Sequence, residues 1–370
     1  MCFMRSYVIL CAIFFQIHFI SFAQNNKVKI GVVGLTHTHV HWIFNSDNTY
    51  QDFDIVGIVE PDKKLAKRYA EQYQFTMDKV YDSLEELIES TQPDAVTAFG
   101  TIYDHLEIVK TCAPLGIHVM VEKPLAVSLN HAKKMKALAK KHNIHLITNY
   151  ETTWYPTNHK AFEIIQQDSI IGDLRKIVVR DGHKGPKKIG VDAEFLEWLT
   201  DPELNGGGAL MDFGCYGANL VTWILNGEKP ESVTAITAQQ QAENNPMVDD
   251  EAIILLKYED MVAVIQASWN WPMGRKDMEV YGLKGALYAD NRNDLRIRIA
   301  EGYDGYKEEQ FKLEEREAPN NDPFVYFTAI INGKITPEAY DLSTLDNNMI
   351  VMEILEAATK SAKSGKTIKL

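Results

Sequence analysis

The sequence predicts a two-domain α/β protein: a doubly wound Rossmann domain on a parallel sheet, then an α+β domain with a large, mainly antiparallel open sheet. Three observations predict it. Short apolar runs alternate with helical spacing of apolar residues up to Thr148, and β-type runs dominate after Tyr150. The length of 370 residues also exceeds what one hydrophobic core usually serves.

The expected strands of the first domain are short apolar segments, and the helices between them repeat apolar residues three and four positions apart. These strands are 28–33, 53–59, 95–98, 119–121 and 145–148, and the helices are 64–73, 83–89, 105–115 and 130–142. In the second domain we expect strands at 176–179, 232–237, 252–258 and 261–269, and one helix at 209–225. The predicted boundaries are 24–149 for the Rossmann domain, 150–340 for the α+β domain and 341–370 for a C-terminal helix and tail.

Residues 1–23 are typical of a secretory signal peptide. Arg5 precedes an apolar run, and Ser21 and Ala23 place small residues at the −3 and −1 positions of a cleavage site. The apolar run is shorter than the roughly 20 residues that a membrane span needs. We therefore expect export to the periplasm, with secretion as the alternative, and no membrane anchor.

Composition excludes some partners. A net charge of −13 opposes binding to nucleic acid and to anionic membranes. Removal of the leader takes away Cys2 and Cys11 and leaves Cys112 and Cys215. Two cysteines are too few for a disulfide framework, and a single bridge between them is not expected because both fall at helix positions expected to be buried.

The tripeptide Glu122-Lys123-Pro124 directly follows the apolar run 117–121. In open α/β sheets, ligands bind beyond the carboxyl ends of the strands. Pro124 biases Lys123 towards an extended conformation at that place. Lys123 is therefore a candidate for a cation that reaches a bound substrate, although a surface lysine before a loop proline is the alternative for an isolated motif.

A phosphate-binding turn after the first strand would read Gly-x-Gly-x-x-Gly. Here the window runs from Gly34 to His39 and keeps only the first glycine, because Thr36 and His39 replace the other two. Glu60 ends the second expected strand, where an acidic side chain binds the adenosine ribose and repels a 2′-phosphate. This favours NAD over NADP, unless Glu60 only opens a turn with the proline that follows.

His37, His39 and His41 alternate along the same window. If a helix begins at Thr38, His37 and His41 lie four residues apart on one face, a spacing that zinc sites use. No cysteine or acidic residue lies near them in sequence, so no metal is expected. Contact of His37 with a phosphate or substrate is favoured, and packing is the alternative.

A glycine run at 206–208 precedes the helix that carries Asp212 and Tyr216 four residues apart. This spacing predicts that the two side chains share one helix face. A tyrosine near an ammonium group and a carboxylate can exchange the proton that leaves when an alcohol becomes a ketone. Otherwise Asp212 is a helix cap and Tyr216 a buried aromatic residue.

These motifs resemble the Gfo/Idh/MocA family, named after glucose-fructose oxidoreductase, inositol dehydrogenase and rhizopine catabolism. Residues 116–126 are similar to its Glu-Lys-Pro signature, and residues 206–214 to its Gly-Gly-Gly…Asp-x-Gly segment. Many relatives carry His and Asp where this chain has Tyr216 and Asn219. The pair found here is similar to the glucose-fructose oxidoreductase and the aldose or dihydrodiol dehydrogenase branch.

The resemblance implies roles for particular residues. Tyr216 would exchange the proton, Lys123 would steady the developing alkoxide, and Asp212 would orient them. The implied NAD contacts are Gly34, Thr36, His37, Glu60, Thr101, His105, Glu122, Lys123 and Asn149. Trp154, Arg180 and His183 are candidates for the sugar pocket only because they lie near these motifs in sequence.

The resemblance implies an NAD-dependent oxidoreductase that acts on a sugar, a glycoside or a polysaccharide-derived saccharide, assembled as a dimer or tetramer. Because the leader would export the chain away from cytoplasmic NAD, we expect NAD to stay tightly bound. One alternative is a glycosidase that uses bound NAD in a cycle of oxidation, elimination and reduction. The other is an inactive glycan-binding scaffold, which the altered glycine turn would explain.

Overall fold

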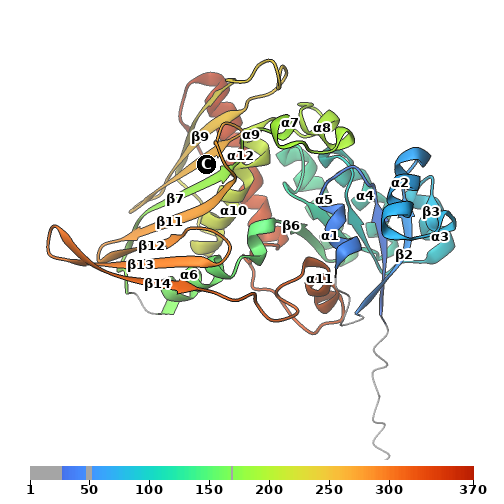
Figure 1. Cartoon of the computed structure of the whole chain (residues 1–370), viewed down its shortest axis with the longest axis horizontal. Helices are drawn as coiled ribbons and strands as arrows, with labels where there is room; N and C mark the ends of the chain where they lie inside the picture. Colours follow the sequence, from blue (N-terminus) through green and yellow to red (C-terminus); the bar gives the residue numbers. More distant parts are fainter. Residues whose placement is uncertain (1–26, 47–51, 168–169) are drawn as a thin grey trace, which may run out of the picture.

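The computed structural model describes residues 27–46, 52–167 and 170–370, which form two sheets side by side (Figure 1). The expected signal peptide lies outside the described residues. Within the described ranges, no helix has both the length and the apolar character needed to cross a membrane.

The first sheet has six parallel strands in the order β3-β2-β1-β4-β5-β6, the order of a Rossmann domain. Its strands are β1 (Val28–Val33), β2 (Phe53–Val59), β3 (Val80–Tyr81), β4 (Ala95–Ala98), β5 (His118–Glu122) and β6 (Leu146–Asn149). The five expected strands are confirmed to within a residue or two, whereas the two-residue edge strand β3 is too short to leave a pattern.

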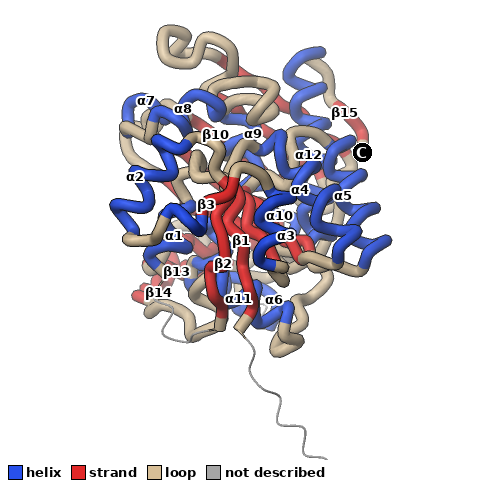
Figure 2. Tube along the Cα trace, turned by 90° about the vertical axis from the view of Figure 1, so that its right-hand side faces the viewer, coloured by secondary structure: helices blue, strands red, loops and turns tan. Residues whose placement is uncertain are grey.

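Helices cover both faces of this sheet (Figure 2). They are α1 (Val40–Asn45), α2 (Lys63–Tyr73), α3 (Leu84–Thr91), α4 (His105–Cys112) and α5 (Leu129–His142). Asp62, Ser83 and Ser128 begin α2, α3 and α5 because their side chains accept hydrogen bonds from the first free backbone N–H groups. Short 3₁₀ turns lie at Met77–Lys79, Ile102–Asp104, Ala113–Leu115 and Glu151–Trp154.

The second sheet has nine strands in the order β14-β13-β12-β11-β7-β10-β9-β8-β15. Only β7 and β10 pair in parallel. The strands are β7 (Leu174–Gly182), β8 (Ser232–Ala238), β9 (Glu251–Lys257), β10 (Val262–Ser268), β11 (Arg275–Gly282), β12 (Gly285–Ala289), β13 (Asp294–Glu301), β14 (Gly305–Lys312) and β15 (Ile368–Lys369). One face packs against α6 (Pro156–Gln167), α10 (Gly214–Ile224) and α12 (Leu345–Ser364).

The single helix expected at 209–225 is wrong: Phe213 separates α9 (Ala209–Asp212) from α10. The carbonyl oxygen of Asp212 accepts hydrogen bonds from Lys123 Nζ and Cys215 Sγ, both at 3.2 Å. The backbone N–H of Tyr216 therefore donates to Phe213 instead, at 3.2 Å. Asp212 and Tyr216 thus lie on two consecutive short helices rather than on one helix face.

Several segments of the second half contact the first domain, among them α11 (Pro323–Ile331) and α8 (Ala193–Leu199). Helix α11 places Phe324 against Phe53 and Phe99, with ring centres 6.3 Å apart in both pairs. Helices α7 (Pro186–Ile189) and α8 lie over the carboxyl ends of the first sheet (Figure 2). The carboxyl ends of the first sheet are therefore covered by residues of the second half.

Candidate active site

Lys123 and Asp212 meet between the two domains. The ammonium group of Lys123 forms an ion pair with Asp212 Oδ1, and both residues are buried. Trp269 holds the other carboxylate oxygen, since its indole Nε1 donates to Asp212 Oδ2 at 3.0 Å. The lysine at the end of β5 is thereby fixed in direction by the last residue of α9.

Both members of this pair are charged. Burial would lower the pKa of Lys123, but Asp212 outweighs burial and raises it above its ordinary value. Burial would likewise raise the pKa of Asp212, but the ammonium of Lys123 and its hydrogen bond lower it. The site therefore presents a buried cation that is held by a carboxylate.

Tyr216 lies beside this cation. The ammonium of Lys123 is 5.4 Å from the centre of the Tyr216 ring, and the ammonium of Lys276 is 5.1 Å from it. Burial raises the pKa of Tyr216 well above its ordinary value, so the phenol stays protonated. A neutral hydroxyl next to a fixed ammonium can donate a proton to an oxygen on which negative charge develops.

Glu122 is the centre of a second buried network. Its Oε2 accepts a hydrogen bond from His39 Nδ1 at 2.9 Å, and its Oε1 accepts one from Asn149 Nδ2 at 2.8 Å. His37 Nε2 lies 3.9 Å from the same Oε2. Burial opposes ionisation, but these neighbours lower the pKa of Glu122 to about 2. A fixed carboxylate therefore lies directly before Lys123 in the chain.

His37, His39 and Glu122 bring three possible metal ligands within 4.8 Å of one another. The hydrogen bonds oppose a metal there. His37 Nδ1 accepts from the backbone N–H of His39 at 3.0 Å, so the neutral imidazole carries its proton on Nε2, facing Glu122. His41 points elsewhere, with its Nε2 3.7 Å from Asp192. The cluster is thus a hydrogen-bond network, and Glu122 gives the two histidines an acidic neighbour that is distant in sequence.

A cavity of about 690 Å³ lies beside Tyr216. Its charged lining side chains are paired within the chain. Arg275 pairs with Asp277, Lys276 with Glu151, Arg292 with Glu315, and Arg296 with Asp290. Tyr155, His183, Phe213 and Met273 add apolar and ring surface. The cavity is therefore polar with balanced charge, suited to a ligand that is rich in hydroxyl groups.

Two family descriptions match consecutive parts of the chain. Residues 28–150 match "Oxidoreductase family, NAD-binding Rossmann fold", and residues 159–288 match "GFO/IDH/MocA C-terminal domain". The trans-1,2-dihydrobenzene-1,2-diol dehydrogenase of Xenopus laevis is 30% identical over 237 residues, which are 64% of this chain and 67% of that protein. The chain belongs to the Gfo/Idh/MocA family. It is accordingly an NAD-binding oxidoreductase of a family whose members act on CH–OH groups.

Solved structures of the family share the fold. An inositol dehydrogenase homologue of Azotobacter vinelandii, solved with NAD+, has a TM-score of 0.77 at 18% identity, over 93% of this chain and 97% of that one. An aldose-aldose oxidoreductase of Caulobacter crescentus, solved with glycerol, has a TM-score of 0.75 at 22% identity, over 93% and 100%. At these identities the likeness establishes the architecture of the Gfo/Idh/MocA chain.

The residues at the strand ends fit NAD. Glu60 directly follows β2 and is buried, where it accepts hydrogen bonds from the backbone of Leu35 and Asp62 at 3.1 and 2.9 Å. Gly34 has φ +84°, and a Cβ there would lie 2.6 Å from the backbone nitrogen of Gly100. Glycine is thus required for the close turn after β1, and Glu60 lies at the end of β2, where Rossmann domains carry the acidic residue that binds an adenosine ribose.

The side chains that replace glycine in this turn make contacts of their own. Thr36 Oγ1 accepts from the indole Nε1 of Trp198 at 3.1 Å, and His39 binds Glu122. The rings of Phe195 and Trp198 lie 4.7 and 5.7 Å from the His37 ring. Helix α8 therefore covers the turn, and the altered glycine pattern matches a turn that is closed by the second domain.

The other predicted cofactor residues lie around this turn. Thr101 caps the 3₁₀ turn after β4 together with Asp104. His105 is buried, and its Nδ1 donates to the carbonyl oxygen of Leu125 at 3.1 Å, so it supports the loop after Lys123. Asn149 orients Glu122, and its own Oδ1 accepts from Trp154 Nε1 at 3.0 Å.

Of the three candidates for the sugar pocket, only His183 lines the cavity beside Tyr216. His183 lines the cavity, with its ring edge against Phe213 at 5.0 Å. Arg180 does not line the cavity, but it is bound to Glu279 and Asp277, which do. Trp154 is buried against Tyr326 and is not among the residues lining the cavity.

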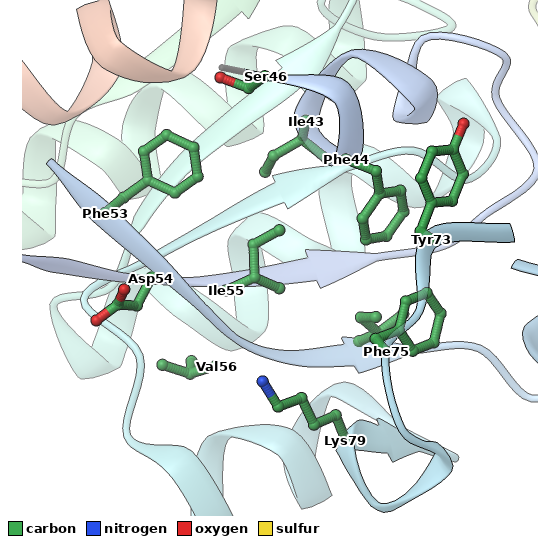
Figure 3. Close-up of a pocket in the computed structure, with 11 residues that line it drawn as sticks. Ile43, Phe44, Ser46, Phe53, Asp54, Ile55, Val56, Tyr73, Phe75 and Lys79 are labelled. Carbon is green, nitrogen blue, oxygen red and sulfur yellow. The ribbon is translucent and has the colours of Figure 1, made fainter. Parts of the chain in front are cut away.

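A second cavity, of about 630 Å³, lies away from this chemistry (Figure 3). Residues 53–56 at the start of β2 line it with side chains from α1, such as Phe44, and with Tyr73 and Phe75. These positions lie at the opposite end of β2 from Glu60. Residues 47–51, which join α1 to β2, are outside the described ranges.

Proposed function

We propose that the protein oxidises a hydroxyl group of an uncharged saccharide, with NAD as the hydride acceptor. The observation that carries the proposal is the placement of Lys123, Asp212 and Tyr216 beside a cavity whose charged side chains are all engaged by chain partners. A charged ligand would bring an uncompensated charge into a cavity whose lining charges already balance, whereas hydroxyl groups bring none. The diol dehydrogenase and aldose oxidoreductase relatives support a polyhydroxylated substrate.

The chain's own residues account for the proton. In the direction of ketone reduction, the Tyr216 hydroxyl donates its proton to the carbonyl oxygen while a hydride adds to the carbon. Lys123 stabilises the negative charge that develops on that oxygen, and Asp212 keeps the ammonium aimed at it. Oxidation runs the same transfers in reverse. NAD, when bound, supplies the chemistry of hydride exchange.

The cofactor would be held by residues at both ends of its path. Glu60 binds the adenosine ribose, the turn at Gly34 approaches the diphosphate, and Glu122, Lys123 and Asn149 stand at the reacting end. The cover that α8 places on the turn supports a cofactor that is retained rather than exchanged freely.

We also propose that the chain is exported and acts as a homo-oligomer. The signal-like leader supports export to the periplasm, where sequencing of the mature N-terminus should give Gln24. The uncovered face of the second sheet exposes Ile236, Leu255 and Val262 by 64%, 46% and 40%, which supports contact between copies. Light scattering of the purified protein would measure the assembly.

The test begins with absorbance and mass analysis of the purified protein for retained NAD. Glucose, glucuronate and glucose 6-phosphate, with a panel of other free sugars and glycosides, are then added separately. We expect the reduced-nicotinamide band to appear with an uncharged member only. A response restricted to charged sugars contradicts the substrate class. A hydrolysed glycoside without net redox favours the glycosidase, and no nucleotide even after adding NAD favours the scaffold.

A further inference from the structure

Asp181 is a buried carboxyl group without a hydrogen-bond partner. It lies near the end of β7 on the helix-covered face, in the same alternation as Ile177 and Val179. Its exposed fraction is 0%, and neither carboxyl oxygen has a partner among the described residues. An unpartnered buried polar group is rare and calls for an explanation. The reaction described above does not use Asp181.

Lys276 is the cation that neighbours Asp181 in the sheet. It lies directly opposite Asp181 in the antiparallel pairing of β7 with β11, so the two side chains project from the same face as neighbours. Lys276 is nevertheless paired with Glu151, which lines the cavity and also accepts a hydrogen bond from Tyr155 at 2.5 Å. One ammonium group thus stands between two carboxyl groups and binds one of them.

The other groups that face Asp181 already have partners. Asp277 is bound by Arg275 and Arg180, Lys123 by Asp212, Tyr155 by Glu151, and the Cys215 thiol by the Asp212 carbonyl. Burial raises the pKa of Asp181 well above its ordinary value, so it is an uncharged acid here. Burial also opposes ionisation of Glu151, but Lys276 and Tyr155 lower its pKa to about 2.

We propose that Lys276 leaves Glu151 for Asp181 when a substrate hydroxyl binds to Glu151. Glu151 is then a substrate-binding residue, and Lys276 and Asp181 are positioning residues beside Tyr216. The exchange rests on the saccharide function proposed above. No covalent bond to carbon changes: Asp181 releases one proton to water, and the new carboxylate pairs with an ammonium that keeps its charge.

The exchange explains why two carboxyl groups surround one lysine. When Lys276 leaves, Glu151 Oε2 is free to accept a hydrogen bond from a substrate hydroxyl, while Oε1 keeps its hydrogen bond from Tyr155. Without Asp181, the departing ammonium would be left unpaired next to a buried ring, which is costly. Asp181 therefore lowers the free-energy cost of moving Lys276 away from Glu151. Because Asp181 loses its proton in this exchange, substrate binding is linked to the release of a proton.

A test without any ligand compares Asp181→Asn in two backgrounds. In the otherwise unchanged protein at pH 7, the folded state keeps a proton on Asp181 that the unfolded chain has lost, so Asp181→Asn should raise Tm by about 2 °C. In the Glu151→Gln background, Lys276 has only Asp181 as a partner, so the same substitution should lower Tm. A shift of the same sign in both backgrounds overturns the exchange.

The pH dependence gives an independent reading. Between the ordinary pKa of 3.8 and the raised folded value, stability of the unchanged protein should fall as pH rises, because the folded state binds the extra proton. Glu60 and Asp249 also have raised pKa values and act in the same direction, so the measured quantity is the difference between two proteins. The contribution of Asp181 should be absent from Asp181→Asn and from Glu151→Gln, so the difference in stability between the unchanged protein and either variant should change with pH in this range. A difference between the unchanged protein and Asp181→Asn that stays constant contradicts the proposal.

The last arm uses the holoenzyme and the sugar that the panel identifies. Calorimetry in two buffers of different ionisation enthalpy should detect release of close to one proton per site at pH 7, and none with Asp181→Asn. That variant should also raise KM about tenfold with little change in kcat, since only the opening of Glu151 is impaired. Turnover without proton release overturns the exchange and leaves the oxidoreductase function standing. If the Tm shift reverses its sign between the two backgrounds but no sugar is turned over, the exchange stands and the oxidoreductase function is overturned.

Discussion

Lys123 and Asp212 are 89 residues apart in sequence and form a buried ion pair between the two domains. Lys123 follows the last residue of β5, and Asp212 ends α9. Neither residue reaches the other unless the second domain is docked on the first. The ion pair that fixes this cation therefore forms only when the two domains are docked.

Substitution of Lys123 by Met should nearly abolish turnover and leave NAD binding measurable. Loss of one group that stabilises developing charge typically lowers kcat by about 100-fold to 1,000-fold. The variant also leaves the Asp212 carboxylate unpaired, so it should lose about 3 to 5 kcal/mol in the free energy of unfolding. Steady-state kinetics, NAD titration and denaturant unfolding measure the three effects.

The matched control is Lys123→Met combined with Asp212→Asn. Because the double variant removes the uncompensated carboxylate, it should regain part of the lost stability but none of the turnover. Retained turnover in either variant would falsify the role given to Lys123.

Tyr216→Phe should keep the ring between Phe213 and the two ammonium groups while removing the acidic hydroxyl. We expect kcat to fall by about 100-fold to 10,000-fold with the fold and NAD affinity unchanged. Tyr150→Phe is the control, since Tyr150 is also buried and meets Tyr216 edge to face at 5.4 Å. Equal losses of kcat in the two variants would show that ring packing rather than the Tyr216 hydroxyl is responsible.

The first domain could be predicted because five of its strands are short apolar runs, three of which end at or directly before a polar residue. Glu60, Glu122 and Asn149 mark the ends of β2, β5 and β6. Parallel strands bring their carboxyl ends to one edge, so the position of Lys123 follows from local sequence alone. The meeting of Lys123 with Asp212 needed the family resemblance as well, because it depends on how the domains dock.

Other parts of the site left no local signal. Lys276, Asp181 and Glu151 come from three separate segments, and only the register of β7 against β11 puts the first two side by side. The break at Phe213 arises because the Asp212 carbonyl is taken by Lys123, a contact between domains. The hydrogen bond between His39 and Glu122 also left no local signal, because the turn and the strand end are 83 residues apart in the sequence of the first domain.

Glu122 should make stability depend on pH in the acid range. Its folded pKa of about 2 lies below the ordinary value of 4.5, so its contribution is present above pH 4.5 and is lost as pH falls towards 2. A shift of this size corresponds to about 3 kcal/mol. Denaturant unfolding at a series of pH values should show that Glu122→Gln is less stable at pH 7 and loses less on acidification.

The measured quantity is the difference between the two proteins, because Asp212 and Glu151 also have lowered pKa values and contribute to acid unfolding in both. If the difference in stability between the unchanged protein and Glu122→Gln stays constant from pH 5 to pH 2, the pKa of Glu122 is not lowered by its hydrogen bonds in the folded protein.

Trp198→Ala should speed the exchange of bound NAD. The indole donates to Thr36 and lies against His37, so it fastens α8 over the turn that approaches the diphosphate. Removing the indole takes away the hydrogen bond and the ring contact together, whereas Trp198→Phe removes the hydrogen bond and keeps a ring. We expect NAD to leave faster in Trp198→Phe and faster still in Trp198→Ala. Retention of NAD after gel filtration, and its displacement by excess labelled NAD, measure this order. An unchanged exchange rate in Trp198→Ala would mean that α8 does not control access to the cofactor, and that the replacement of glycine by Thr36 serves only the contact between the domains.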